Sequence, residues 1–318
     1  MKKTLLSFIF GLATLAAFTQ EQAIYTHYQV LPVLINPGYT GFEDQHQFLL
    51  NARNAWTGFP GQPTTYTVMY NGPVGDKLAL GGGLFSEKIG AASLFKLQLN
   101  YAFRFRVQKA KIGLGLSTEF LRKQVDASYL SNNLVDTRDD VLEGMVNGQQ
   151  IFDASVGAHI LYDDRFFVSL TIPNTVRARL DNIPTGGTAT NSAGLFSHYV
   201  FQLGYIVNVA NQNFKFIPSL TMRNIRDTPN AIDVNLQGRF LDDKLIAGLT
   251  YRATDKGDAV FLIGTKFKNL QVYYSYDVSF SKFQQYNSGS HELSVALTLP
   301  HRTAATPPAA TNPSELYH

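Results

Sequence analysis

Apolar and polar residues alternate with a period of two, segment after segment, between about Gln47 and Leu299. In the clearest segment, Phe95 to Val107, every odd position is apolar or aromatic, and the even positions except Ala102 are Lys, Gln, Asn or Arg. Side chains of a β-strand point alternately to its two faces, so this segment has one apolar and one polar face. Its thirteen residues exceed the roughly 5–6 of a soluble strand and reach the roughly 9–11 that cross a membrane. The pattern predicts membrane-spanning strands.

The same pattern predicts fourteen antiparallel strands along the chain. Their approximate cores are 47–54, 64–71, 77–86, 94–107, 110–122, 152–162, 165–173, 197–208, 213–223, 231–241, 244–252, 259–267, 269–279 and 291–299. Every second connection is tight, for example Asp163-Asp164, whereas others are long, for example 174–196. Outer-membrane barrels combine short periplasmic turns with longer outer loops. We therefore expect an all-β fold, a transmembrane outer-membrane β-barrel with periplasmic N- and C-termini. The alternative, a soluble β-sandwich, gives no reason for tight and long connections to alternate along the chain.

The N-terminus carries the marks of an export signal. Lys2 and Lys3 precede an apolar run from Leu5 to Phe18, and a small-residue site follows it. The alternative, a membrane anchor, needs a longer run. We predict a signal peptide over 1–19, a periplasmic or lumen-facing segment over 20–45, the barrel over 46–299 and a flexible periplasmic tail over 300–318.

Composition excludes several classes of protein. The chain has no cysteine, so it can form neither a disulfide nor a thiolate metal site. Its net charge is only +3 and its basic residues are scattered, unlike those of a nucleic-acid-binding protein. No apolar run of about 18 residues follows the signal, which excludes an α-helical membrane protein but not a barrel. The 23 Phe and 16 Tyr suit aromatic girdles at the membrane interfaces of a barrel in the outer membrane.

The polar faces of the predicted strands carry many charged residues. They are Lys96, Arg104, Arg106, Glu119, Asp153, His159, Lys215, Arg223, Asp233, Arg239, Arg252, Lys266 and Asp277. They could form a charged conduction path. Opposite charges could instead pair across strands to satisfy a polar interior, and we favour this interpretation because a lumen filled with long side chains needs such pairing.

Enzymatic signals are weak. His159, Ser155 and Asp153 are expected on one face of one strand, where they cannot form a nucleophile–base relay without partners from other strands. No nucleophile elbow, zinc-protease motif or phosphate-binding loop is present. An acidic cluster around Asp136 and Glu143 could attract calcium, but it lacks the EF-hand spacing. We expect a non-enzymatic protein with no cofactor and no metal site.

Two segments near the N-terminus interrupt the alternation. The first, residues 34–41 (LINPGYTG), combines a turn-forming Asn-Pro pair with two glycines. The second, residues 53–65 (RNAWTGFPGQPTT), contains the only tryptophan of the chain. Its aromatic residues could belong to the outer girdle or hold a peptide of a partner. The candidate partner-binding residues are Asn36, Pro37, Tyr39, Gly41, Arg53, Trp56, Gly58 and Phe59.

The order of these features resembles the PorP/SprF family of type IX secretion-associated outer-membrane proteins of Bacteroidota. The matching elements are INPGYTG at 35–41, RNAWTGFPGQPTT at 53–65, GGGLFSEKIG at 81–90 and the hairpin HILYDDRFFVSLTIPNT at 159–175. One departure is Gly38-Tyr39-Thr40-Gly41, where the family more often has Ala-Tyr-Ala-Gly. The resemblance covers essentially the whole mature chain.

The resemblance implies a non-enzymatic barrel that works with the type IX secretion and gliding machinery. It implies two partners: a large secreted surface protein with a C-terminal targeting domain, exported or anchored at the outer loops, and periplasmic or peptidoglycan-associated secretion components. The lipid bilayer surrounds the barrel, and no nucleic acid is expected. The alternative is a passive transporter of small or hydrophobic solutes, like the fatty-acid barrels. A third hypothesis, an outer-membrane hydrolase, needs His159 to meet a serine and an acid in space.

Overall fold

The computed structural model describes residues 25–128, 146–176, 178–180, 198–209, 213–225, 230–254 and 256–301 of the 318-residue chain. The predicted signal peptide, the acidic cluster around Asp136 and Glu143, and the part of the predicted tail after His301 lie outside the described residues. Within the described part, no helix is long and apolar enough to cross a membrane.

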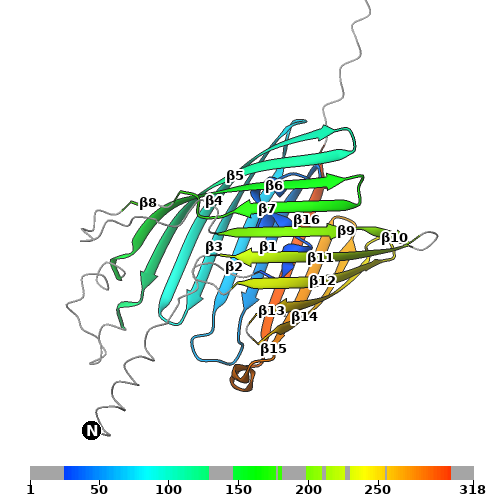
Figure 1. Cartoon of the computed structure of the whole chain (residues 1–318). Helices are drawn as coiled ribbons and strands as arrows, with labels where there is room; N and C mark the ends of the chain where they lie inside the picture. Colours follow the sequence, from blue (N-terminus) through cyan, green and yellow to red (C-terminus); the bar gives the residue numbers. More distant parts are fainter. Residues whose placement is uncertain are drawn as a thin grey trace, which may run out of the picture.

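The described strands form one closed antiparallel sheet (Figure 1). They are β1 (Gln45–Asn54), β2 (Thr64–Val74), β3 (Leu78–Ile89), β4 (Ala92–Val107), β5 (Ala110–Val125), β6 (Gln149–Tyr162), β7 (Phe166–Ile172), β8 (Ala178–Arg179), β9 (Tyr199–Tyr205), β10 (Val207–Val209), β11 (Phe214–Asn224), β12 (Ala231–Phe240), β13 (Leu245–Ala253), β14 (Asp258–Phe267), β15 (Leu270–Ser279) and β16 (Ser290–Pro300). Pairing of β1 with β16 and of β9 with β11 completes the circle. The described wall therefore has fourteen strands, because β9 and β10 are parts of one strand and the two-residue β8 pairs only with β6. The predicted all-β antiparallel barrel of fourteen strands is confirmed, and the periplasmic position of both termini remains a prediction.

The two ends of the barrel differ. At one end, here called the turn end, consecutive strands are joined by short connections such as 75–77, 108–109 and 268–269. At the other, the loop end, lie longer connections such as 55–63 and 280–289, the latter with the 3₁₀ helix η5 (Lys282–Tyr286). Two connections at the loop end are also short, namely 90–91 between the long strands β3 and β4 and 254–257 between β13 and β14. β1 begins and β16 ends at the turn end.

The side chains that alternate in the sequence form the outer and inner surfaces of the wall. In β4, Phe95 and Tyr101 point outward with 49% and 45% of their surface exposed, whereas Lys96 and Asn100 point inward and are 9% and 1% exposed. An apolar outer face matches the hydrocarbon of a bilayer, and the polar face is turned to the lumen.

The wall has one interruption inside a strand. Residue Ile206 separates β9 from β10, and in the register of these strands it lies opposite Ile217, the neighbour of Pro218 in β11. Proline has no backbone N–H and cannot complete the ladder there, so it pairs regularly only with Leu236 on the β12 side.

The segment from Tyr25 to Asp44 lies inside the barrel (dark blue in Figure 1). We call it the plug. It contains three short 3₁₀ helices, η1 (His27–Gln29), η2 (Pro32–Leu34) and η3 (Pro37–Tyr39). It is too short to have a core of its own, so its side chains are buried against the inner surface of the wall. The plug continues directly into β1 at the turn end.

Candidate functional site

The plug is anchored near the loop end by the carboxylate of Glu292 on β16. Glu292 accepts hydrogen bonds from the backbone N–H groups of Thr26 at 2.7 Å and His27 at 3.3 Å. It also accepts from Asn51 Nδ2 at 2.8 Å and Arg53 Nη1 at 3.0 Å, both on β1. Glu292, Thr26 and His27 are fully buried. One carboxylate thus holds the plug backbone and two side chains of the neighbouring strand.

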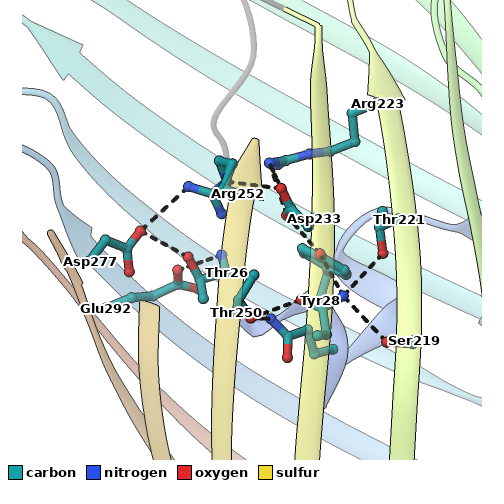
Figure 2. Close-up of polar contacts among 12 residues, drawn as sticks. Thr26, Tyr28, Ser219, Thr221, Arg223, Asp233, Thr250, Arg252, Asp277 and Glu292 are labelled. Carbon is teal, nitrogen blue, oxygen red and sulfur yellow. Dashed lines mark hydrogen bonds and ion pairs between the residues drawn. The ribbon is translucent and has the colours of Figure 1, made fainter. Parts of the chain in front are cut away.

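Buried ion pairs continue from this carboxylate around the wall (Figure 2). Arg53 Nη2 donates to Asp277 Oδ2 at 2.7 Å, and Arg252 Nη1 lies 3.7 Å from the same oxygen. Arg252 Nε and Arg223 Nη2 both bind the Asp233 carboxylate at 3.1 Å. Three arginines face the carboxylates of Asp233, Asp277 and Glu292, so the charges of the anchor balance. Burial of ions is tolerated only with such pairing.

The plug contributes hydroxyl groups to the same network. Tyr28 Oη donates to Asp233 Oδ2 at 2.8 Å, and Thr26 Oγ1 donates to Asp277 Oδ2 at 3.0 Å. Figure 2 shows both side chains pointing from the plug toward the wall carboxylates. We call residues Thr26 to Tyr28 with these partners the polar anchor.

Below the polar anchor, the plug packs an apolar layer against the wall. Leu31, Val33 and Leu34 are at most 6% exposed. Their cluster includes inward-facing apolar side chains of the wall, namely Leu49, Met69, Phe85, Ile246, Leu262, Tyr273 and Ala296. A polar lumen would leave these side chains in water, so their presence on the inner face is explained by the plug.

Glycines of the wall form a cradle for the next turn of the plug. Asn36 Nδ2 donates to the backbone oxygen of Ala158 on β6 at 2.9 Å, and its Oδ1 caps Gly38 N at 2.8 Å. A Cβ built on Gly115 would lie 2.2 Å from the carbonyl carbon of Pro37, and one on Gly157 would lie 2.1 Å from Asn36 Oδ1. No side chain fits at either position, so the plug backbone touches the wall backbone.

At the turn end, the last plug residues close the lumen. Arg104 on β4 donates to the backbone oxygen of Gly41 at 2.5 Å and pairs with Asp44 at 3.1 Å. Gly41 has a φ of +60°, and a Cβ there would lie 2.6 Å from the Cβ of Ala79. Glycine is required here both by conformation and by space.

His159 takes part in this closure. Its ring contacts Phe42 at 4.5 Å and Tyr39 at 4.9 Å between centroids, and its Nδ1 lies 2.5 Å from Ser169 Oγ on β7. Ser155 instead donates to Glu119 at 3.1 Å. The plug therefore covers His159, and its serine partner is not the one on its own strand. Within the described residues, no group of His, Asp and Glu side chains is arranged to hold a metal ion.

The loop end of the lumen is hollow above the polar anchor. Two cavities that share Thr65, Glu87 and Ile225 form what we call the outer chamber. The larger one, about 330 Å³, is lined by Arg53, Arg252 and Asp277 below and by Trp56 and Phe283 at its rim. The smaller one, about 80 Å³, extends beside the plug as far as Leu34, Ile35 and Pro37.

An aromatic cluster forms the rim of the outer chamber. Phe283 of η5 contacts Trp56 and Phe59 edge-on, at centroid distances of 5.4 and 5.1 Å. Gly58 between them has a φ of +87°, which allows the tight turn. We call Trp56, Phe59 and Phe283 the aromatic rim.

The turn end has a polar cavity of about 220 Å³, which we call the inner mouth. It is lined by Tyr39 and Glu43 of the plug and by Arg239 and Lys266 of the wall, among others. Among the described residues, no carboxylate lies within 4.0 Å of Arg239 or Lys266. Both cations therefore face the mouth without an ion-pair partner from the described chain.

The predicted partner-binding residues fall into three places. Asn36, Pro37 and Gly41 are buried in the plug, and Tyr39 lies beside the inner mouth. Arg53 belongs to the polar anchor. The remaining three, Trp56, Gly58 and Phe59, lie at the loop end.

Sequence reasoning missed most partners of the plug. Glu292 and the cradle glycines Gly113, Gly115 and Gly157 were not identified, although all four occupy inward positions of the alternation. The detectable signal was the spacing of Gly113 and Gly115, because glycines two apart remove side chains from one face of a strand.

The chain is similar to proteins of one family and to known barrels. The family model of the type IX secretion system membrane protein PorP/SprF matches residues 17–297. Among solved structures, the CymD monoaromatic hydrocarbon channel matches with a TM-score of 0.54 at 10% identity, over 88% of this chain and 94% of that chain. The Ralstonia pickettii toluene transporter TbuX matches with a TM-score of 0.50 at 9% identity, over 84% and 92%. At this identity the likeness shows the fold alone. No curated protein sequence matches the chain.

Proposed function

Because the chain belongs to the PorP/SprF family of type IX secretion system membrane proteins, we propose that it is a closed adaptor in the outer membrane. Its loop end faces outward and holds a large secreted surface protein that carries a C-terminal targeting domain. Its turn end faces the periplasm and contacts secretion or gliding components.

The observation that carries this proposal is the plug. An adaptor needs two accessible ends and a rigid body, whereas a transporter needs a continuous path. The polar anchor, the apolar layer and the glycine cradle fill successive levels of the lumen with buried contacts. The barrel fold is shared with hydrocarbon channels, which keeps passive transport as the second candidate. The plug weighs against it, because it would have to leave its buried contacts to open a path.

The aromatic rim is the proposed contact for the surface protein. Phe59 is 38% exposed and packs on Phe283, so the two rings offer a rigid apolar surface beside the outer chamber. Replacing Trp56 and Phe59 together by alanine should weaken binding at least ~30-fold, because aromatic anchors at interfaces typically contribute ~2 kcal/mol or more. The amount of targeting-domain proteins retained on intact cells, measured by mass spectrometry after surface proteolysis, checks this result.

The matched control for the rim is Phe267→Ala. Phe267 is 68% exposed and lies at the turn end, so its loss should leave surface retention unchanged. Small-solute uptake should be equal in all variants. A variant that folds normally, changes uptake and leaves the surface proteome intact would exclude the adaptor.

The inner mouth is the proposed contact for an acidic segment of a periplasmic component. Replacing Arg239 and Lys266 by glutamate reverses both unpaired charges and should reduce copurification of periplasmic partners at least ~10-fold at low salt, since like charges repel across an interface. Native purification from outer membranes with quantitative mass spectrometry measures this effect. The double variant Lys77→Glu with Lys268→Glu makes the same change of charge at the turn end outside the mouth. An equal loss of copurification in both variants would show a general effect of charge and would contradict a binding site at the inner mouth.

A further inference from the structure

The outer chamber is lined by charged side chains of both signs. Its larger cavity is bounded by the arginines of the polar anchor and, beside them, by Lys256 in the connection between β13 and β14 and by Asp258 at the start of β14. Neither Lys256 nor Asp258 takes part in an ion pair or a side-chain hydrogen bond with the described residues. The charged residues of the lining are Arg53, Arg223, Arg252, Lys256, Glu87, Asp258 and Asp277. The chamber therefore has no strong excess of either charge.

The polar anchor leaves hydrogen-bonding capacity unused beside this cavity. Arg223 donates only through Nη2 and Arg252 only through Nε, although a guanidinium group carries five N–H donors. Arg252 Nη2 and Asp277 Oδ1 have no hydrogen-bond partner among the described residues. Both side chains are more than nine-tenths buried and line the cavity. Buried polar groups are normally hydrogen-bonded, so a bound group that both donates and accepts would complete this side of the anchor.

The guanidinium groups lie on the chamber side of the anchor. Asp233 lies between Arg223 and the plug residue Tyr28 (Figure 2), and it binds both. Arg223 lines the chamber, whereas the Asp233 carboxylate is covered by its partners and does not. A molecule in the chamber therefore meets the donors of the network first.

Trp56 at the aromatic rim is held in a strained conformation. Its φ is +54°, in the left-handed region that is unusual for a bulky residue. Its backbone N–H donates to Ser290 Oγ at 3.1 Å, and its carbonyl accepts from the N–H of Phe59 at 3.0 Å. Strain of this kind persists only where the surrounding structure enforces it, and it is concentrated at functional sites. Here it places an indole ring at the opening of a polar cavity.

These groups fit a ligand rich in hydroxyls. A hydroxyl both donates and accepts, so neighbouring hydroxyls can accept from Arg252 and donate to Asp258 or Asp277. An anion would be repelled by the carboxylates of the lining, and a cation by its arginines. The apolar C–H face of a sugar ring packs well on an aromatic ring such as that of Trp56. The cavity, about 330 Å³, lies at the lower end of the range of roughly 300–1,000 Å³ typical of small-molecule sites.

We propose that the outer chamber binds a neutral saccharide, one or two sugar residues at the end of a glycan. The proposal goes beyond the adaptor function because it adds a ligand at the loop end. Two sources have this chemistry, a glycan on a surface protein and a glycan of a surface lipid. Binding to the purified barrel involves neither the client nor the orientation in the membrane, so this proposal and the adaptor function can fail separately.

The single tryptophan of the chain provides the test. Trp56 is the only tryptophan, so its fluorescence reports on the rim of the chamber alone. The full-length protein, in an amine oxide detergent that has no sugar group, is titrated with N-acetylglucosamine and galactose. It is also titrated with oligosaccharides released from the surface proteins and, separately, from the surface lipids of the producing cells. We expect a saturable change in emission, and the pool that binds at the lower concentration identifies the source. A saturable change with peptides of the surface protein and with no saccharide, or with none of these probes, would overturn the proposal.

Removal of the free carboxylate should weaken this binding. Asp258→Ala should lower the affinity for the bound saccharide at least ~10-fold, because hydrogen bonds to charged groups are among the stronger ones. Asp258→Asn keeps the shape of the side chain and should lower it less. The matched control is Asp126→Ala, which removes a carboxylate from the loop end outside the chamber and should leave the affinity unchanged. Heat-dependent mobility in gel electrophoresis shows which variants are folded. Wild-type affinity in folded Asp258→Ala and Asp258→Asn proteins would contradict the site.

Discussion

Replacing Gly115 by valine should open the barrel to ions. A Cβ at Gly115 meets the plug backbone at Pro37, at 2.2 Å from its carbonyl carbon and 2.3 Å from its oxygen. Both sides of this contact are backbone, so no flexible side chain can move to relieve the overlap. The cost is therefore at or above the upper end of the ~1–3 kcal/mol typical of overpacking. The position faces the lumen, so the wall can still close. We expect the wild-type protein to be closed in planar bilayers and the Gly115→Val protein to conduct.

Gly82→Val is the matched control for this prediction. Gly82 is a strand glycine of the same wall, but a Cβ there has its nearest neighbour, Gln98 O, at an ordinary 3.5 Å. This variant should remain closed. Proteolysis of the plug from the turn end should rise only in Gly115→Val, and mobility in gel electrophoresis with and without heating shows that both barrels are folded. A folded Gly115→Val protein as closed as wild type would refute the role of the cradle, and a conducting wild type would favour the transporter.

Removal of the Glu292 carboxylate should cause the largest loss of stability of any single polar substitution. Glu292→Ala leaves the N–H groups of Thr26 and His27 and one side of the Arg53 guanidinium without their acceptor in a fully buried site. Breaking a buried ion pair by removing one partner costs about 3–5 kcal/mol, since the remaining charge stays buried. The free energy of unfolding in detergent or lipid, from urea titration, measures this loss.

Two comparisons show whether the loss arises from charge. Glu292→Gln keeps the shape and one acceptor oxygen, so it should retain part of the stability. Replacing Asp163, whose pair with Lys109 is exposed at the turn end, should leave the midpoint of unfolding unchanged, because exposed pairs contribute little. Equal midpoints for Glu292→Ala and wild type would mean that the plug is not held by this carboxylate.

The strands of the barrel were predictable because each one is encoded locally. The alternation from Phe95 to Val107 needs only the period of a strand and the requirement that one face meet lipid. In the structure, Phe95 points outward and Lys96 inward, as the pattern predicts. Most of the predicted inward charged residues, for example Lys96, Glu119 and Asp153, are buried on the inner face, and those of the polar anchor pair across strands, as in the interpretation that we favoured.

The plug was not predictable to the same degree because its residues are specified by partners far away in sequence. Asn36 and Pro37 are recognisable as turn formers, but their position depends on Gly115 and Gly157, more than seventy residues later. Inward apolar residues such as Met69 contradict a simple polar lumen, and only the plug explains them. These glycines and apolar residues can be seen in the sequence, but a single sequence does not show which residues they contact.

The polar anchor also has a consequence for the order of events during assembly. Its contacts join residues that are 205 positions apart, for Tyr28 with Asp233, and 266 positions apart, for Thr26 with Glu292. Contacts of such separation are slow to form because a long chain must first be closed into a loop. Glu292 belongs to β16, the strand that seals the barrel against β1. The contact of Thr26 with Glu292 therefore cannot form before the last strand is in place, so that closure of the barrel and fixation of the plug become a single step.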